Sequence, residues 1–108
     1  MWVRQWRSNV SRANSDACLE FLQTVAVPRH KKAEGNLRAH VLRIAGELAD
    51  EFRLFSYWHS LEAIQAFTLR EETTILHSQA EHGYRLSVEP DILIYQPFDL
   101  DDYDFPPP

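Results

Sequence analysis

The stretch EFRLFSYWHSLEAIQAF, residues 51–67, decides the fold of this chain. Its first part alternates in the manner of a β-strand. The apolar residues of one face are Phe52, Leu54 and Trp58, and those of the other are Phe55 and Tyr57. From Ser60 onward, apolar residues recur at helical spacing instead. A strand that is apolar on both faces needs a cover on each, so we expect helices of the same chain on one face and a second copy of the chain on the other.

The size and charge of the chain limit its class. With 108 residues, 44% of them hydrophobic, the chain predicts one compact domain over residues 1–98. The net charge of −5 argues against the basic surface that nucleic acids and anionic membranes select. Four of the 16 acidic residues fall in residues 99–108, which we interpret as an acidic, proline-ended C-terminal tail.

The cysteine content and the N-terminus predict the compartment. Cys18 is the only cysteine, so no internal disulfide can form, and its apolar neighbours indicate a small buried residue in a helix. The first ten residues lack the apolar run of a signal peptide, and no window has the length and hydropathy of a membrane span. We therefore expect a cytoplasmic protein without membrane contacts.

Periodicity predicts the remaining elements. The predicted strands are residues 1–10, 37–45, 51–59 and 92–95, and the predicted helices are residues 15–27, 60–70 and, as a broken helix, 71–88. Asn14 or Ser15 is expected to cap the first helix. Pro28 is expected to end that helix near Val27, because proline disfavours helical geometry in the residue before it.

The segment RHKKAE, residues 29–34, is predicted to be a charged, solvent-exposed connection that includes a solvent-facing His30. The alternative is a basic rim that attracts an anionic ligand. Gly35 and Asn36 then predict a turn before the next strand.

The order strand, helix, strand, strand, helix, strand is that of an α+β, ferredoxin-like β-α-β-β-α-β domain with an antiparallel sheet. Helices cover one side of such a sheet and leave the other side bare. Because the bare side is expected to be apolar, two sheets should pack face to face as a homodimer and form a dimeric α/β barrel.

Several motifs agree with this arrangement. In FSYWHSLEAI, residues 55–64, a tryptophan ends the strand and a Ser-x-Glu-Ala turn opens the helix. Further motifs are Arg4-x-Trp6, Pro28, Gly35-Asn36 and Glu89-Pro90. Together, over residues 2–98, they resemble the antibiotic biosynthesis monooxygenase-like family. The resemblance implies a homodimer with a pocket between the sheet and the helices of each subunit.

The family includes cofactor-independent oxygenases of aromatic polyketides, heme-degrading monooxygenases and proteins of unknown role. Trp58 matches both kinds of enzyme. The polyketide oxygenases have an asparagine where this chain has Leu54. The heme-degrading members have an asparagine at Trp6 or Arg7 and a histidine near Phe67, so their pattern is matched by the tryptophan alone.

Cofactor-independent oxygenation requires a general base that deprotonates a phenol in a pocket from which water is excluded. Histidine suits this role. The candidate catalytic residues are His77, His59 and Tyr84, and the candidate substrate-binding residues are Trp58, Trp6, Arg4, His40 and Phe67. The structural alternatives are core or interface packing for the tryptophans, a surface or hydrogen-bonded role for each histidine, and a helix-to-sheet anchor for Tyr84.

The sequence shows no usual metal-ligand spacing, no glycine-rich phosphate loop and no nucleophile elbow, so we expect no metal and no cofactor. The function we expect is a small cofactor-independent enzyme acting on a hydrophobic aromatic or polyketide-like metabolite. A monooxygenase is the first choice, and a cyclase or isomerase is a variant. The alternative is a non-catalytic ligand-binding or regulatory dimer, and a heme-degrading oxygenase is least favoured.

Overall fold

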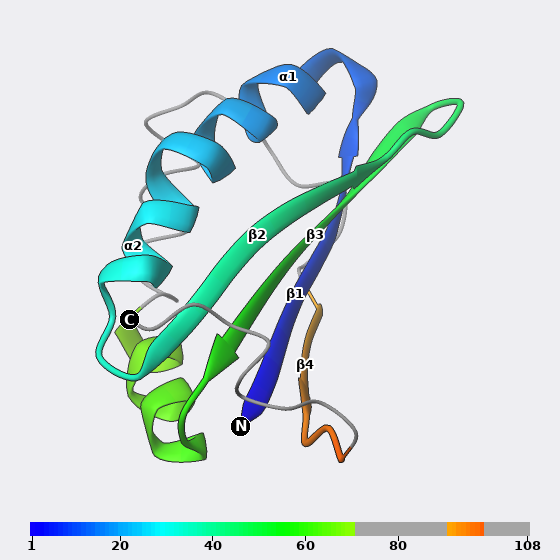
Figure 1. Ribbon diagram of the computed structural model, residues 1–108. Coiled ribbons are helices and arrows are strands. Elements are labelled where there is room, and N and C mark those ends of the chain that lie inside the picture. The colour runs from blue at the N-terminus through cyan, green and yellow to red at the C-terminus, as the bar shows by residue number, and fades with distance from the viewer. Residues whose placement is uncertain (71–90, 99–108) are drawn as a thin grey trace.

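A computed structural model describes residues 1–70 and 91–98 of the chain. Its four strands are β1 (Trp2–Ser11), β2 (Asn36–Ile44), β3 (Ala49–Trp58) and β4 (Asp91–Tyr95), and its helical segments are α1 (Arg12–Phe21), η1 (Leu22–Ala26), α2 (Val27–Lys32) and residues 61–70. The strands form one antiparallel sheet in the order β2-β3-β1-β4 (Figure 1). This order confirms the predicted ferredoxin-like fold. The predicted broken helix at 71–88 lies outside the described residues.

The alternation of β3 places one set of its side chains in the core. Phe52, Leu54, Ser56 and Trp58 are all buried, and the residues between them are half-buried. The same alternation on β1 turns Trp6 and Val10 toward the helices. One core cluster joins these strands to α1 and η1, and a second joins Trp58 to Ile64 and Phe67 of the helix at 61–70. The core therefore lies between the sheet and the helices.

The first helix continues past Pro28, so the prediction that it ends near Val27 is wrong. Between α1 and α2 the chain forms the π-helix η1, and the residues at both of its ends keep right-handed helical angles. Pro28 stands in the first turn of α2, where a missing N–H is tolerated. The π-helix η1, with its wider turn, lies shortly before Pro28. The backbone hydrogen-bond pattern therefore changes at η1, and the helix continues past the proline.

The predicted cap of the first helix is also wrong. The helix begins at Arg12 after Ser11, and among the described residues Ser11 makes no side-chain capping bond. Ser15 is instead buried inside the helix, where its hydroxyl donates a hydrogen bond to Asp50 Oδ2 at 2.5 Å. Ser15 therefore ties α1 to the start of β3.

The predicted start of the second helix is confirmed. The hydroxyl of Ser60 accepts a hydrogen bond from the backbone N–H of Ala63 at 3.2 Å, as an N-cap residue does. Gly35 occupies the turn before β2 with a φ of 86°, which glycine adopts without strain. Its carbonyl accepts the N–H of His59 at 2.9 Å, so the turn and the end of β3 hold each other in place.

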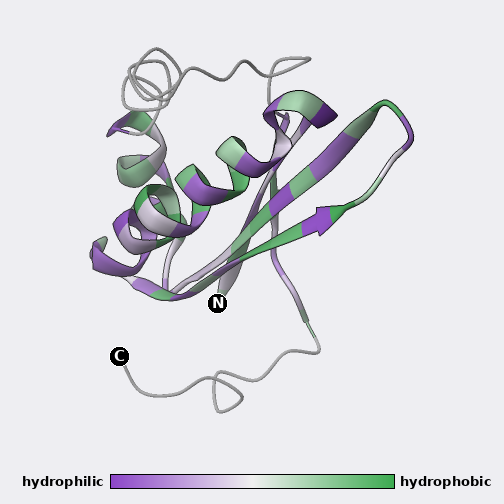
Figure 2. Ribbon diagram, turned by 90° about the horizontal axis from the view of Figure 1, so that it is seen from above, coloured by the Kyte–Doolittle hydropathy of each residue, from purple (hydrophilic) through white to green (hydrophobic). Residues whose placement is uncertain are grey.

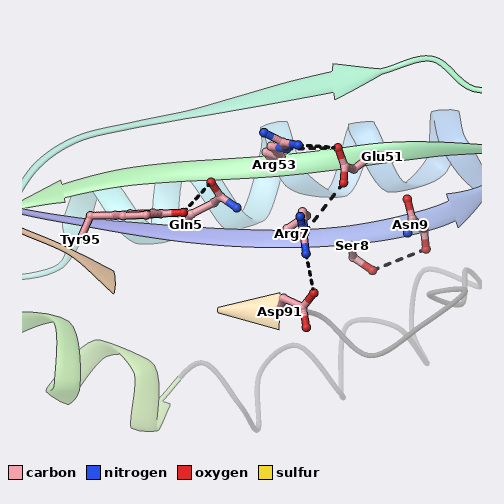
Figure 3. A network of polar contacts seen from close by, with 8 residues as sticks. All are labelled: Gln5, Arg7, Ser8, Asn9, Glu51, Arg53, Asp91 and Tyr95. Carbon is pink, nitrogen blue, oxygen red and sulfur yellow. Dashed lines mark hydrogen bonds and ion pairs between the residues drawn. The ribbon is translucent and has the colours of Figure 1, made fainter. Parts of the chain in front are cut away.

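No described element covers the other face of the sheet. Arg7 at its centre forms ion pairs with Asp91 at 2.9 Å and Glu51 at 3.8 Å, and Arg53 pairs with Glu51 at 3.0 Å (Figure 3). Apolar and aromatic side chains flank this charged centre: Val3, Phe55, Tyr57, Leu93 and Tyr95 on one side, and Leu42 and Ile44 on the other. We call this surface the open face; it is mixed rather than uniformly apolar.

The hairpin of β2 and β3 extends beyond the helices (Figure 1), and its ribbon carries bands of hydrophobic and hydrophilic residues (Figure 2). Leu42, Ile44 and Leu48 are exposed along it. Among residues 1–70 and 91–98, no helix has the length and hydropathy needed to cross a membrane.

Candidate functional site

A buried arginine lies at the centre of the candidate site. Arg4 stands on β1, on the face that the helices cover, and only 1% of its surface is exposed. Its Nε donates a hydrogen bond to Thr68 Oγ1 at 3.2 Å, and its Cζ lies 5.6 Å from the ring centroid of Phe67. A buried cation requires polar and aromatic groups in place of the water that it loses. Arg4 therefore places positive charge in a buried environment that excludes most water.

His30 of α2 lies beside Arg4, and the prediction that it faces solvent is wrong, because only 2% of it is exposed. Its Nδ1 lies 2.7 Å from the carbonyl oxygen of Ala26, and its Nε2 lies 3.4 Å from Nη1 of Arg4. A carbonyl only accepts and a guanidinium only donates, so Nδ1 carries the proton and Nε2 accepts. Burial, reinforced by the charges of Arg4 and Arg29, lowers the pKa of His30 to about 4. The ring is therefore neutral at pH 7.

Two aromatic rings enclose this pair. The ring of Phe67 lies 4.3 Å from that of His30 and 5.1 Å from that of Trp58, centroid to centroid. Trp58 is fully buried, and its Nε1 donates a hydrogen bond to Ser56 Oγ at 2.8 Å. Trp58 therefore has both its apolar surface and its polar atom satisfied within the core.

A cavity of about 10 Å³ lies between the sheet and the helices, which is room for about one water molecule. Its lining residues are Arg4, Trp6, Phe21, Leu22, Ala26, His30 and Leu54. Within the described part of the chain, the buried Nε1 of Trp6 has no hydrogen-bond partner. An unsatisfied buried donor costs about 1–3 kcal/mol. Trp6 lines this cavity, which is large enough for about one water molecule and too small for a larger ligand.

A larger hollow opens to solvent next to the buried cluster. It has a volume of about 570 Å³ and is lined by Arg29, Lys32, Ala33, Glu34, Phe67 and Arg70. We call it the basic basin. Phe67 is 4% exposed and belongs both to the basin and to the ring contacts of His30. Phe67 therefore separates the basin from the Arg4–His30 pair.

Of the predicted substrate-binding residues, Arg4 and Phe67 lie near each other, and Trp58 packs on Phe67. Trp6 belongs to the other core cluster and lines the small cavity beside Arg4. His40 instead lies on the open face, where its ring is 5.7 Å from those of both Phe55 and Tyr57. Burial, with a contribution from the charge of Arg38, lowers the pKa of His40. His59 is exposed after the end of β3. His77 and Tyr84 lie outside the described residues, so their catalytic roles stay predictions.

Sequence reasoning missed His30 and Thr68. Leu22, Ala26 and His30 recur every four residues, and this spacing places His30 on the buried face of a helix that continues through Pro28. Nothing local in the sequence indicates the contact of Thr68 with Arg4, because 64 positions separate the two residues.

The remaining chemistry of the described residues is limited. In the part of the chain that the structure covers, no group of three or more His, Cys, Asp and Glu side chains is arranged to hold a metal ion. Cys18 is fully buried, as predicted, and burial raises the pKa of its thiol to about 12. A thiol that stays protonated is a poor nucleophile, so Cys18 is a packing residue.

A model of one known protein family matches this sequence. The family model named antibiotic biosynthesis monooxygenase matches residues 1–75. The chain belongs to this family. The match includes β1, the first helix, the β2–β3 hairpin and residues 61–70, and so every residue of the Arg4–His30 cluster. No curated protein sequence matches the chain.

Solved structures share the fold of this family member. A Nitrosomonas europaea protein named for antibiotic biosynthesis monooxygenase has a TM-score of 0.71 at 17% identity, over 90% of this chain and 98% of the other. A Mycobacterium tuberculosis protein has a TM-score of 0.66 at 18% sequence identity, and the alignment covers 93% of this chain and 98% of the other. A monooxygenase of Streptomyces coelicolor, solved in complex with nanaomycin D, has a TM-score of 0.69 at 15% identity, and the alignment covers 93% of this chain and 89% of the other. At sequence identities below 20%, the similarity to these structures establishes a shared fold only.

Proposed function

We propose that this protein is a cofactor-independent monooxygenase of a hydrophobic aromatic metabolite. The observation that supports this proposal is the buried guanidinium of Arg4, held between His30, Thr68 and the ring of Phe67. Family membership and the nanaomycin D complex of the Streptomyces coelicolor monooxygenase agree with an aromatic substrate.

The proposed role of Arg4 is electrostatic. A phenol placed against a buried cation loses its proton more readily, because the cation stabilises the phenolate. An electron-rich phenolate transfers an electron to dioxygen, and recombination forms a carbon-bound peroxide. Loss of water from the peroxide then converts a CH₂ group and O₂ into C=O and H₂O. The substrate supplies all the electrons, so this reaction requires no external reductant.

His30 acts as a positioning residue in this proposal. Its pKa of about 4 makes it a weak base at neutral pH, whereas effective general bases have pKa values near the working pH. Its Nε2 instead accepts from Arg4 and fixes the direction of the guanidinium. The predicted general base, His77, lies outside the described residues and stays a prediction.

In this proposal the substrate enters by displacing Phe67. The cavity next to Arg4 holds about one water molecule, which is far too little for an aromatic ring. The basic basin is large enough, and Phe67 lies between the two. Movement of the Phe67 ring would connect the basin to Arg4.

Oxygen uptake tests this proposal. The purified protein, with chelator and without added cofactor, is mixed with 1,8-dihydroxyanthrone, and dioxygen is followed with an electrode. We expect uptake with one water and one quinone formed per dioxygen, and a loss of about a hundredfold in kcat for Arg4→Met. Arg12→Met removes an exposed arginine and serves as the matched control. Equal rates for Arg4→Met and wild type would contradict the role of Arg4.

A non-catalytic ligand-binding protein is the second candidate. The low pKa of His30, about 4, favours it, because the histidine beside Arg4 is then a weak base at neutral pH. Saturable binding of the anthrone without oxygen uptake, at pH 6 to 9, would select this candidate.

We also propose that the protein is a homodimer paired through its open face. The side chains Val3, Phe55 and Tyr57 would be covered in such a pair, and the charged centre around Arg7 would set its register. Sedimentation equilibrium at micromolar concentration should give twice the 12.6 kDa mass of one chain. Phe55→Glu, which places a charge on the apolar part of this face, should give the monomer.

A further inference from the structure

The basic basin concentrates positive charge on a chain whose net charge is −5. Among the described residues that line it, Arg29, Lys32 and Arg70 are cations and Glu34 is a carboxylate. The other described lining residues, Ala33 and Phe67, are apolar. A hollow that combines several cations with an aromatic ring suits a ligand that carries both an anionic group and an apolar body.

The helix dipole accounts for only part of this arrangement. Basic residues in the last turn of α2 stabilise the negative end of that helix, and this explains Arg29 and Lys32 without any ligand. Arg70, however, belongs to a different helix and lines the same hollow. Lys31 lies in the same last turn of α2 but does not line the basin. Cations from two elements therefore converge on the basin, which a single helix end does not require.

We propose that the basic basin binds the anionic group of an aromatic ligand, with the ring directed toward Phe67. This inference rests on the proposed function, because it names the substrate class of the same site: an aromatic acid or an aromatic phosphate rather than a neutral phenol. Arginine offers paired donors that match the two oxygens of a carboxylate or a phosphate, and Lys32 adds a third charge.

The expected strength of recognition follows from exposure. Arg29, Lys32 and Arg70 are exposed, so each charge contributes modestly and is screened by salt. A single exposed charge pair corresponds to an affinity change of up to about fivefold. Discrimination between an acid and its neutral analogue should therefore be clear at low ionic strength and weaker at 0.5 M salt.

The test uses a matched pair of probes. Binding of 2-naphthoate and of 2-naphthamide, which has the same ring and no charge, is measured by isothermal titration calorimetry on the wild-type protein at low salt. We expect the acid to bind about tenfold more tightly than the amide, since the effects of separate charges add. A third titration, with 2-naphthyl phosphate, compares the two anions and shows how far the additional negative charge of a phosphate increases the affinity over that of a carboxylate. Equal affinity for acid and amide would overturn the proposal.

Charge-removing variants locate the effect. Lys32→Gln and Arg70→Gln should each weaken 2-naphthoate binding about two- to fivefold and leave 2-naphthamide unchanged. Lys31→Gln is the matched control, since it removes the same charge one residue from Lys32 but outside the basin lining. An effect of Lys31→Gln as large as that of Lys32→Gln would show a general attraction to the helix end and would also overturn the proposal.

The experiment separates this inference from the proposed function. Selective binding of the acid without oxygen uptake from any phenolic probe would uphold the basin and reject the monooxygenase. Oxygen uptake from the anthrone with no preference for the naphthoate over the amide would uphold the monooxygenase and reject the basin.

Discussion

Arg4 donates a hydrogen bond from Nη1 to Nε2 of His30 at 3.4 Å, in a buried pair that joins β1 to α2. The contact between the two side chains determines which nitrogen of His30 carries the proton. His30 uses its only proton to bond the carbonyl of Ala26, so it remains an acceptor for Arg4. A protonated His30 would place a second positive charge against the guanidinium without solvent to screen it.

The first prediction concerns the pH dependence of stability. The pKa of His30 is about 4 in the folded state and about 6.5 when the chain is unfolded. The unfolded chain therefore binds the proton first as pH falls, and the free energy of unfolding should decrease between pH 6.5 and pH 4, by on the order of 3 kcal/mol from this residue. Below pH 4 the loss from His30 should stop, because both states then carry the proton. Denaturant titrations at intervals of half a pH unit measure this.

The control for this prediction is His30→Gln, which cannot titrate. The slope of stability against pH in the window from 6.5 to 4 should be smaller in this variant than in the wild type. Identical slopes would mean that other groups cause the pH dependence.

The second prediction concerns the hydrogen bond of Trp58. Ser56→Ala removes the acceptor of its buried Nε1 and should destabilise the protein by about 1–3 kcal/mol, because the donor is left without a partner. In the Trp58→Phe variant the indole N–H is already absent, so Ser56→Ala should lower the free energy of unfolding by less than it does in the wild type. Chemical denaturation of the four proteins in this double-mutant cycle measures the difference.

The third prediction compares two serines that precede helices. Ser60 accepts the N–H of Ala63, so Ser60→Ala should cost about 0.5–2 kcal/mol. Ser60→Asp should retain stability because aspartate also caps. Ser11→Ala is the matched control and should be close to neutral, since no capping bond of Ser11 is present among the described residues. Equal losses at both positions, measured by thermal denaturation, would contradict the capping assignment.

The fourth prediction concerns Gly35. A Cβ at this position would lie 2.7 Å from Cβ of Ala63, and the φ of 86° disfavours residues other than glycine. Gly35→Ala should therefore destabilise the protein through both contributions. Ala63→Gly itself lowers helix stability by up to about 1 kcal/mol, so it serves as the reference. In the Ala63→Gly background, Gly35→Ala should cost only the backbone part, about 1–2 kcal/mol. An equal cost of Gly35→Ala in both backgrounds would show that the steric contact is unimportant.

The sequence predicts the fold well because its signals are local. Alternation along Ala49–Trp58 and the Ser60 cap lie within single elements, and both are present in the structure. The errors at Pro28 and Ser15 have a different origin: a π-helix absorbs the proline, and Asp50, 35 positions away, binds the serine. Local rules do not include such distant partners.

The candidate site was predicted in part for the same reason. Trp58 and Arg4 follow from strand alternation and from the family resemblance. Their surroundings depend on tertiary contacts, since Arg4 and His30 are 26 positions apart. The sequence predicts His30 in a charged loop because of Pro28, but the helix that buries His30 continues through this proline.

A ¹⁵N NMR titration of the His30 imidazole, observed through its long-range couplings and assigned with His30→Gln, tests the Arg4–His30 pair itself. We expect a neutral ring at pH 7, protonated at Nδ1, that gains its second proton only near pH 4. A ring that titrates near pH 6.5, or that carries its proton at Nε2, would contradict the Arg4–His30 hydrogen bond and the proposed site.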